Sequence, residues 1–141
     1  QMAVFLLRGI HGSDYTPPSA GADTGFADVP ADHPMAAWIK QLAAEGITGG
    51  CSNGSYCPDA VVTRAQMAVF LLRSKYTSAY TPPPANGDFT DVPLDHLMAA
   101  WIEQLAAEGI TGGCGVGLYC PDGNVTRDQM AVFLVRTFNL P

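Results

Sequence analysis

The sequence predicts a mainly α fold built from tandem helix-loop-helix repeats. Three observations support this fold class: a long internal repeat, apolar residues at helical spacing within each copy, and a Thr-Arg-x-Gln motif that opens an apolar run. Such repeats bury their apolar faces by stacking on their neighbours.

The repeat spans residues 26–73 and 89–136, which align without gaps at an offset of 63 and differ at eleven of 48 positions. Residues 1–8 match 66–73, so we expect them to be the second-helix tail of a truncated repeat, within a chain that is a fragment or a processed product. The expected organisation is tail 1–8, Pro/Gly-rich linker 9–25, repeat 26–73, Pro-rich linker 74–88 and repeat 89–138. Both linkers contain Tyr-Thr-Pro-Pro and should be extended connectors.

The first helix of each repeat is expected over about residues 34–45 in the first copy. Its apolar side chains lie on one face at helical spacing: Met35, Trp38, Ile39 and Leu42. Asp32 or His33 can cap the helix start, and Pro34 suits its first turn. Gly46 suits the left-handed position that ends the helix, with Ile47 folding back on Leu42.

The second helix opens with a capping box. Thr63 and Gln66 in the first copy, and Thr126 and Gln129 in the second, have the spacing at which each side chain bonds to the other residue's backbone N–H. The following Met-Ala-Val-Phe-Leu run is apolar on nearly every side. A helix of this kind is buried on most sides, which places the second helices at the centre of the assembly.

Composition excludes several functional classes. The hydrophobic fraction is 48% and the charged fraction 14%, which excludes a disordered chain. The formal charge is −6 and the basic residues are scattered, so nucleic acid is not an expected partner. No apolar stretch has the roughly 18–20 residues of a membrane span.

Each full repeat carries two cysteines separated by five residues, Cys51 with Cys57 and Cys114 with Cys120. Structural zinc sites usually space such pairs by two to four residues and add further ligands, and no CxxC redox motif is present. The turn-like residues between the cysteines favour a short disulfide across a small hairpin, which would add roughly 2 kcal/mol of stability. Such bridges indicate an oxidising, extracellular location.

Four ordered motifs carry a family resemblance: Phe-x-Asp-Val-Pro, then His before a helix ending Leu-Ala-Ala-Glu-Gly-Ile-Thr-Gly, a Pro-Asp turn, and Val-Thr-Arg-x-Gln. In this order the chain resembles the S-layer homology family over both full repeats and the 1–8 tail. The resemblance implies helix pairs around a pseudo-threefold central bundle. It also implies an exported protein at the cell surface that binds cell-wall polysaccharide, often pyruvylated, non-covalently in grooves between repeats.

The chain departs from the family pattern at three places. Gln66 and Gln129 replace the glutamate of the family's Thr-Arg-Ala-Glu motif, which keeps the capping box and removes a carboxylate. Pro34 and Leu97 follow the histidines where the family usually has an aromatic residue, and a tryptophan comes four residues later. The cysteines occupy turn positions where the family usually has an aromatic and a basic or polar residue.

The expected ligand contacts are three pairs of equivalent residues: Arg64 and Arg127, Trp38 and Trp101, Asp28 and Asp91. Each arginine offers a planar fork for a carboxylate beside a helix N-terminus; the alternative is a salt bridge to a nearby aspartate. The tryptophans either stack on a sugar or pack in the core. The aspartates either orient a groove or terminate a turn.

No catalytic constellation is present, so we expect no enzyme activity, no cofactor and no metal. The predicted function is a non-catalytic anchoring module for cell-wall polysaccharide. The alternative is a structural module that packs against copies of itself or other proteins in a surface layer or filament.

Overall fold

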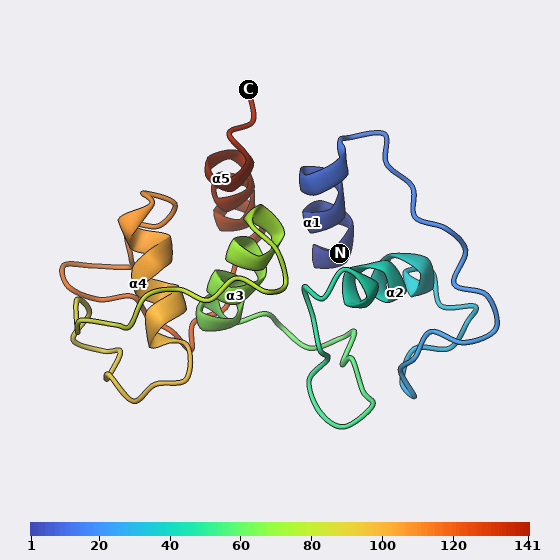
Figure 1. Ribbon diagram of the computed structural model, residues 1–141, viewed down its shortest axis with the longest axis horizontal. Helices are drawn as coiled ribbons and strands as arrows, with labels where there is room; N and C mark the ends of the chain where they lie inside the picture. Colours follow the sequence, from blue (N-terminus) through green and yellow to red (C-terminus); the bar gives the residue numbers. More distant parts are fainter. The chain divides into compact units, whose positions relative to one another are not determined.

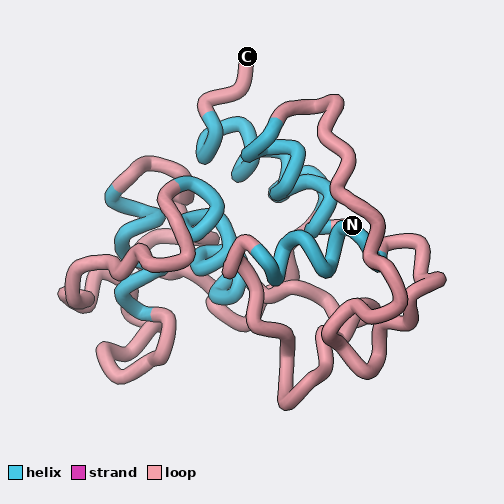
Figure 2. Tube along the Cα trace, turned by 45° about the vertical axis from the view of Figure 1, so that its right-hand side comes forward, coloured by secondary structure: helices cyan, strands magenta, loops and turns pink.

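The computed structural model describes all residues 1–141 as a mainly helical chain. It contains five helices: α1 (Met2–His11), α2 (Ala36–Ala44), α3 (Arg64–Lys75), α4 (Ala99–Ala107) and α5 (Arg127–Phe138) (Figure 1). Long loops connect them, with isolated β-bridges and no strands (Figure 2). The predicted fold class of tandem helical repeats with two disulfide-clamped loops is confirmed. The pseudo-threefold bundle stays a prediction.

The chain divides into two compact units, residues 1–60 and 61–141. In the first unit α1 packs against α2. Its core is apolar and fully enclosed, and it includes Leu6, Leu7, Val29, Ile39, Leu42 and Ile47. The second helix of one repeat thus packs against the first helix of the next.

The second unit follows the same principle with one helix more. α3 packs against both α4 and α5. The unit's largest enclosed side chains are Met67, Leu71, Leu72, Ile102, Leu105, Ile110 and Tyr119. α3 is buried on most of its length, as its all-round apolar sequence predicts.

The first helices begin later than the sequence suggests, at Ala36 rather than near residue 34. The Nδ1 atom of His33 accepts a hydrogen bond from the backbone N–H of Met35 at 3.0 Å, so residues 33–35 form a turn that leads into α2. At the other end Gly46 has a φ of 71°, and the N–H of Ile47 donates to the Leu42 carbonyl at 3.1 Å. This is the left-handed helix end expected there.

The helices run slightly into the expected linkers, because α1 continues to His11 and α3 to Lys75. The remaining linker residues contain no helix or strand, and Tyr15 and Tyr80 fold back onto the following helix. Tyr15 meets the Trp38 ring edge-on at 6.2 Å between centroids, and Tyr80 meets Trp101 at 6.0 Å. None of the helices is long and apolar enough to cross a membrane.

Candidate functional site

The candidate site lies in the second unit, around the start of α3. Thr63 caps this helix: its hydroxyl accepts from the Gln66 N–H at 3.2 Å, and the Gln66 side chain accepts from the Thr63 N–H at 3.0 Å. α5 opens with the same reciprocal box between Thr126 and Gln129, at 3.3 and 3.5 Å. The capping residues therefore fix where each Thr-Arg-x-Gln arginine stands.

Arg64 is buried against the loop of the following repeat. Its Nε–H donates to the Tyr119 carbonyl at 2.8 Å, and its guanidinium lies 4.9 Å from the centre of the Tyr119 ring and 5.8 Å from that of Phe133. The Tyr119 hydroxyl in turn donates to the Arg64 carbonyl at 2.7 Å. Backbone bonds from Arg64 to Gly123 and from Ala65 to Pro121 complete the joint. Arg64 thus joins two consecutive repeats.

Arg127, the equivalent residue of the second full repeat, is exposed. Arg64 gains its burial from residues 119–133 of the repeat that follows it. The two arginines therefore have the same place in the motif and different surroundings.

A pocket of about 240 Å³ opens beside Arg64. It is bounded by the start of α3, one face of α5 and the turn after Ile110. The residues that line it are Arg64, Thr111, Gly112, Gly113, Asp128, Gln129, Val132, Phe133 and Arg136.

The pocket carries charges of both signs. Arg64 forms part of its buried wall, whereas Arg136 is exposed and donates from Nη1 to the Ile110 carbonyl at 3.3 Å. Asp128 supplies one carboxylate, which accepts from the Thr126 hydroxyl. Two guanidinium groups against one carboxylate leave a single net positive charge. That balance favours an anionic ligand over a cationic one.

Asp28 and Asp91 hold the cysteine loops. Asp28 accepts backbone N–H bonds from Tyr56 at 2.8 Å and Cys57 at 2.7 Å, and Asp91 accepts the equivalent bonds from Tyr119 and Cys120 at 2.9 and 2.7 Å. The Tyr56 N–H bond is the largest cause that lowers the pKa of Asp28. Burial opposes ionisation of Asp91, but the two N–H bonds and the nearby Arg64 charge hold its pKa below the usual value. The alternative considered for Arg64 and Arg127, a salt bridge to a nearby aspartate, does not form for either arginine.

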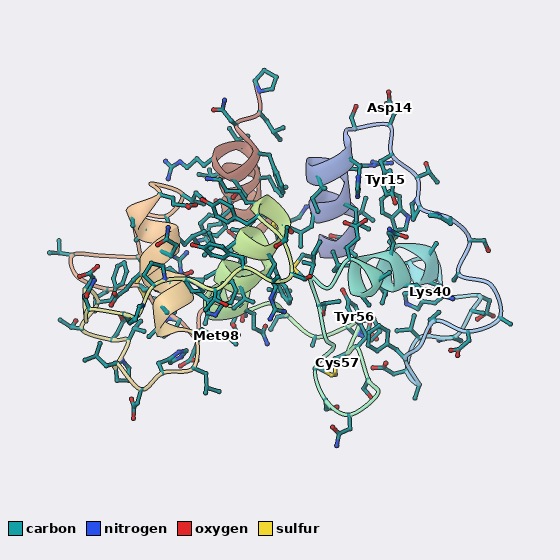
Figure 3. All side chains as sticks on the ribbon, in the orientation of Figure 1. Asp14, Tyr15, Lys40, Tyr56, Cys57 and Met98 are labelled. Carbon is teal, nitrogen blue, oxygen red and sulfur yellow. A yellow bond between two sulfur atoms is a disulfide. The ribbon has the colours of Figure 1, made fainter.

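The cysteines form the two predicted disulfides, Cys51–Cys57 and Cys114–Cys120. Figure 3 labels Cys57 in the loop of the first unit. In both, the Cα atoms are 6.0 Å apart. Asp91 lies close to Cys114 and Cys120, but two sulfurs bonded to each other offer no thiolate for a metal ion. Each loop turns tightly, with the Cys51 N–H donating to the Ser55 carbonyl at 2.9 Å.

The tryptophans lie in clusters with the linkers. Trp38 and Trp101 are half-buried, and an arginine lies over each ring, Arg8 at 5.3 Å and Arg73 at 5.5 Å. Trp101 does not line the pocket. These contacts anchor the linker tyrosines onto α2 and α4.

Sequence reasoning did not select Arg136 or the Thr111-Gly112-Gly113 turn for the site. One signal was available, because Ile-Thr-Gly-Gly is repeated unchanged at 47–50 and 110–113. Of the expected ligand contacts in this unit, the structure brings Arg64 to the pocket, while Asp91, Trp101 and Arg127 lie outside its lining.

Comparisons with known proteins agree with the repeat pattern. Residues 25–68 and 88–131 match the S-layer homology domain. The chain is 32% identical over 117 residues to a cell surface protein of Thermoanaerobacter kivui, and 29% identical over 123 residues to an S-layer protein of Bacillus thuringiensis subsp. finitimus. It is 30% identical over 113 residues to an endoglucanase of Bacillus sp. strain KSM-635. These alignments cover 82%, 87% and 80% of this chain but only 15%, 15% and 12% of the relatives.

Proposed function

Because the chain belongs to the S-layer homology domain family, and so to modules of the cell surface, we propose that it anchors its parent protein by binding cell-wall polysaccharide. The module binds without catalysis, and its parent protein is exported. The observation that carries the proposal is the pocket formed by Arg64, Arg136 and the 111–113 turn.

The pocket suits one acidic sugar residue. Its volume of about 240 Å³ lies below the roughly 300–1,000 Å³ typical of sites for drug-sized ligands. Its excess of one positive charge matches a sugar that carries a single carboxylate, such as a pyruvyl ketal. Gln129 and Asp128 offer hydrogen-bonding groups for sugar hydroxyls.

Arg127 extends the proposal to the second full repeat. Arg64 lines a pocket because the 111–133 segment of another repeat packs beside it. We propose that Arg127 would contribute to a second pocket of this kind where a further repeat packs against α5. Asp91 supports the pocket beside Arg64 by holding the backbone of Tyr119 and Cys120, and Trp101 fixes the linker onto α4. Asp28 and Trp38 have the equivalent roles in the first unit.

A pull-down with purified cell-wall sacculi tests the proposed function. The chain should sediment with intact sacculi. Most of this binding should be lost on sacculi from which the polysaccharide has been stripped, and also on a separate preparation from which only the pyruvyl groups have been removed. Retention on stripped sacculi would refute polysaccharide binding. Loss on full stripping, with retention after removal of pyruvyl groups, would refute only the acidic-sugar assignment.

A second function, assembly with neighbouring copies, is favoured by the surface of the second repeat. Exposed apolar residues stand where the first repeat has Ala31, Pro34, Asn53 and Ser55. They are Leu94 (64% exposed), Leu97 (93%), Val116 (104%) and Leu118 (39%). Apolar groups exposed to this degree are typical of interaction surfaces when they form a contiguous patch.

Analytical ultracentrifugation distinguishes the two functions. Concentration-dependent association that disappears in L97P/V116N, which restores the residues of the first repeat, would support assembly. A monomer at all concentrations that still binds sacculi would leave anchoring alone.

A further inference from the structure

One of the eleven differences between the repeats reverses a charge: Lys40 in α2 corresponds to Glu103 in α4. The two residues occupy the same position of helices whose sequences are otherwise identical, Ala36–Ala44 and Ala99–Ala107. Both side chains bond to the backbone of the linker that precedes their own repeat. The sign of each side chain can therefore be compared with the backbone groups, carbonyl oxygens or N–H groups, that its linker turns towards it.

In the first unit the linker presents carbonyl oxygens. The Lys40 ammonium donates to the carbonyl of Ala20 at 2.7 Å and to that of Asp23 at 2.6 Å. Figure 3 shows Lys40 on α2 next to this linker. Thr24, the following residue, is buried and donates its hydroxyl to the Val29 carbonyl at 2.5 Å, which fixes the linker where it enters the repeat.

In the second unit the linker presents N–H groups. The Glu103 carboxylate accepts from the backbone nitrogens of Asn86 at 2.5 Å, Gly87 at 2.7 Å and Asp88 at 2.9 Å. Gly87 has a φ of 89°, a left-handed conformation that suits a run of N–H groups converging on one anion. Glu103 is only 7% exposed. Burial opposes its ionisation, but the three N–H bonds hold its pKa below the usual value.

Exchange of the linkers would place like groups together. The 86–88 segment on α2 would set three N–H donors against an ammonium, which has no acceptor. The 20–23 segment on α4 would set carbonyl oxygens against a buried carboxylate, which accepts only. Glu103 is buried, so the loss of its three N–H donors would cost several kcal/mol in general. Lys40 is exposed, so the mismatch there would cost less, through the loss of its two bonds to carbonyl oxygens.

We propose that Lys40 and Glu103 are positioning residues, each of which selects the backbone conformation of the linker that precedes its own repeat: carbonyl oxygens turned towards α2, N–H groups turned towards α4. Both linkers also use Tyr-Thr-Pro-Pro and set a tyrosine against the tryptophan of the helix. The helix-end carboxylates differ in their linker partners, since Glu45 meets His11 whereas Glu108 meets Lys75 and Tyr76. The contact at residues 40 and 103 is the one at which the sign of the helix side chain is reversed. This inference is independent of the proposed ligand.

A double-mutant cycle between residue 40 and its linker tests the proposal. One change is K40E. The other replaces residues 19–25 (SAGADTG) with the sequence of residues 84–88 (PANGD). The readouts are the melting temperature and the rate of proteolytic cleavage within the linker. K40M is the control that removes the charge and keeps the length of the side chain.

Each single change should lower the melting temperature by about 3–6 °C and speed linker cleavage, with K40M less affected than K40E. The combination of K40E with the 84–88 linker should recover most of the loss, because it recreates the pairing of the second unit. Additive losses in the combined variant would overturn the proposal. Equal effects of K40E and K40M would overturn it as well, because the sign of the charge would then be irrelevant.

Discussion

Tyr119 and Asp91 are two of the residues that make the stability of the second unit depend on pH. The Asp91 carboxylate accepts hydrogen bonds from the backbone N–H groups of Tyr119 and Cys120. The Tyr119 hydroxyl donates to the Arg64 carbonyl. Burial raises the pKa of Tyr119 to about 12, although the Arg64 charge acts to lower it. Tyr119 therefore contributes to the pH dependence of stability on the alkaline side and Asp91 on the acidic side.

The alkaline limit tests Tyr119. A raised pKa in the folded state means that its stabilising contribution is complete below pH 10 and is lost as the pH rises from 10 towards 12. The free energy of unfolding, measured in urea, should therefore fall by about 2–3 kcal/mol over this range. Y119F should be less stable at neutral pH and should lose this part of the alkaline dependence. The same steep loss in Y119F would contradict the assignment.

The acid limit tests Asp91. A lowered pKa in the folded state means that its contribution is complete above the ordinary value of 3.8 and is lost as the pH falls through the folded-state pKa. D91N should cost about 1–2 kcal/mol at pH 7, because an amide replaces a charged acceptor of two N–H bonds. D28N in the first unit is the matched control. It should cost less, since the Arg64 charge acts on Asp91 and is not among the causes of the shift at Asp28. Equal costs would exclude a role for Arg64 in this loop.

At the scale of elements, the sequence was most informative where partners are close along the chain. The contacts predicted correctly join residues at most six positions apart. They are the capping boxes, the helix-end bond between Ile47 and Leu42 beside the left-handed Gly46, and both disulfides. The expected start of α2 was two residues early because His33 bonds to the Met35 backbone and holds that stretch in a turn. Periodicity alone does not reveal such a turn.

The disulfide loops give a test at this scale. Cys114 follows the pocket residue Gly113, and Cys120 follows Tyr119, so C114S/C120S should destabilise the second unit by about 2 kcal/mol and weaken wall binding. C51S/C57S, in the first unit, should cost similar stability without the loss of binding. The measurements are urea unfolding and sedimentation with sacculi. Equal loss of binding in both variants would contradict a specific role for the Cys114–Cys120 loop in shaping the pocket.

At the scale of the whole molecule, the sequence predicted the tandem helical class but not the surroundings of its arginines. Arg64 meets Tyr119, which lies 55 residues further along, and Arg136 bonds to Ile110, 26 residues earlier. Contacts of this kind depend on how one repeat packs on the next. The same packing explains why the compact units divide at residues 60 and 61, inside a sequence repeat: α3 packs with the repeat that follows it.

The central claim is that the pocket beside Arg64 binds the wall polysaccharide. Arg64 itself is a poor probe because its burial makes any charge reversal a test of folding. Arg136 and Arg127 are both exposed arginines of α5, and only Arg136 lines the pocket, so they form a matched pair.

Isothermal titration of the purified chain with solubilised wall polysaccharide, on the wild type, R136E and R127E, is the most direct test. R136E should weaken the affinity by about tenfold or more, since it reverses one of the two positive charges that line the pocket. R127E should stay within about twofold of the wild type. Equal affinities for all three proteins, or a larger loss in R127E than in R136E, would contradict the assignment of the pocket.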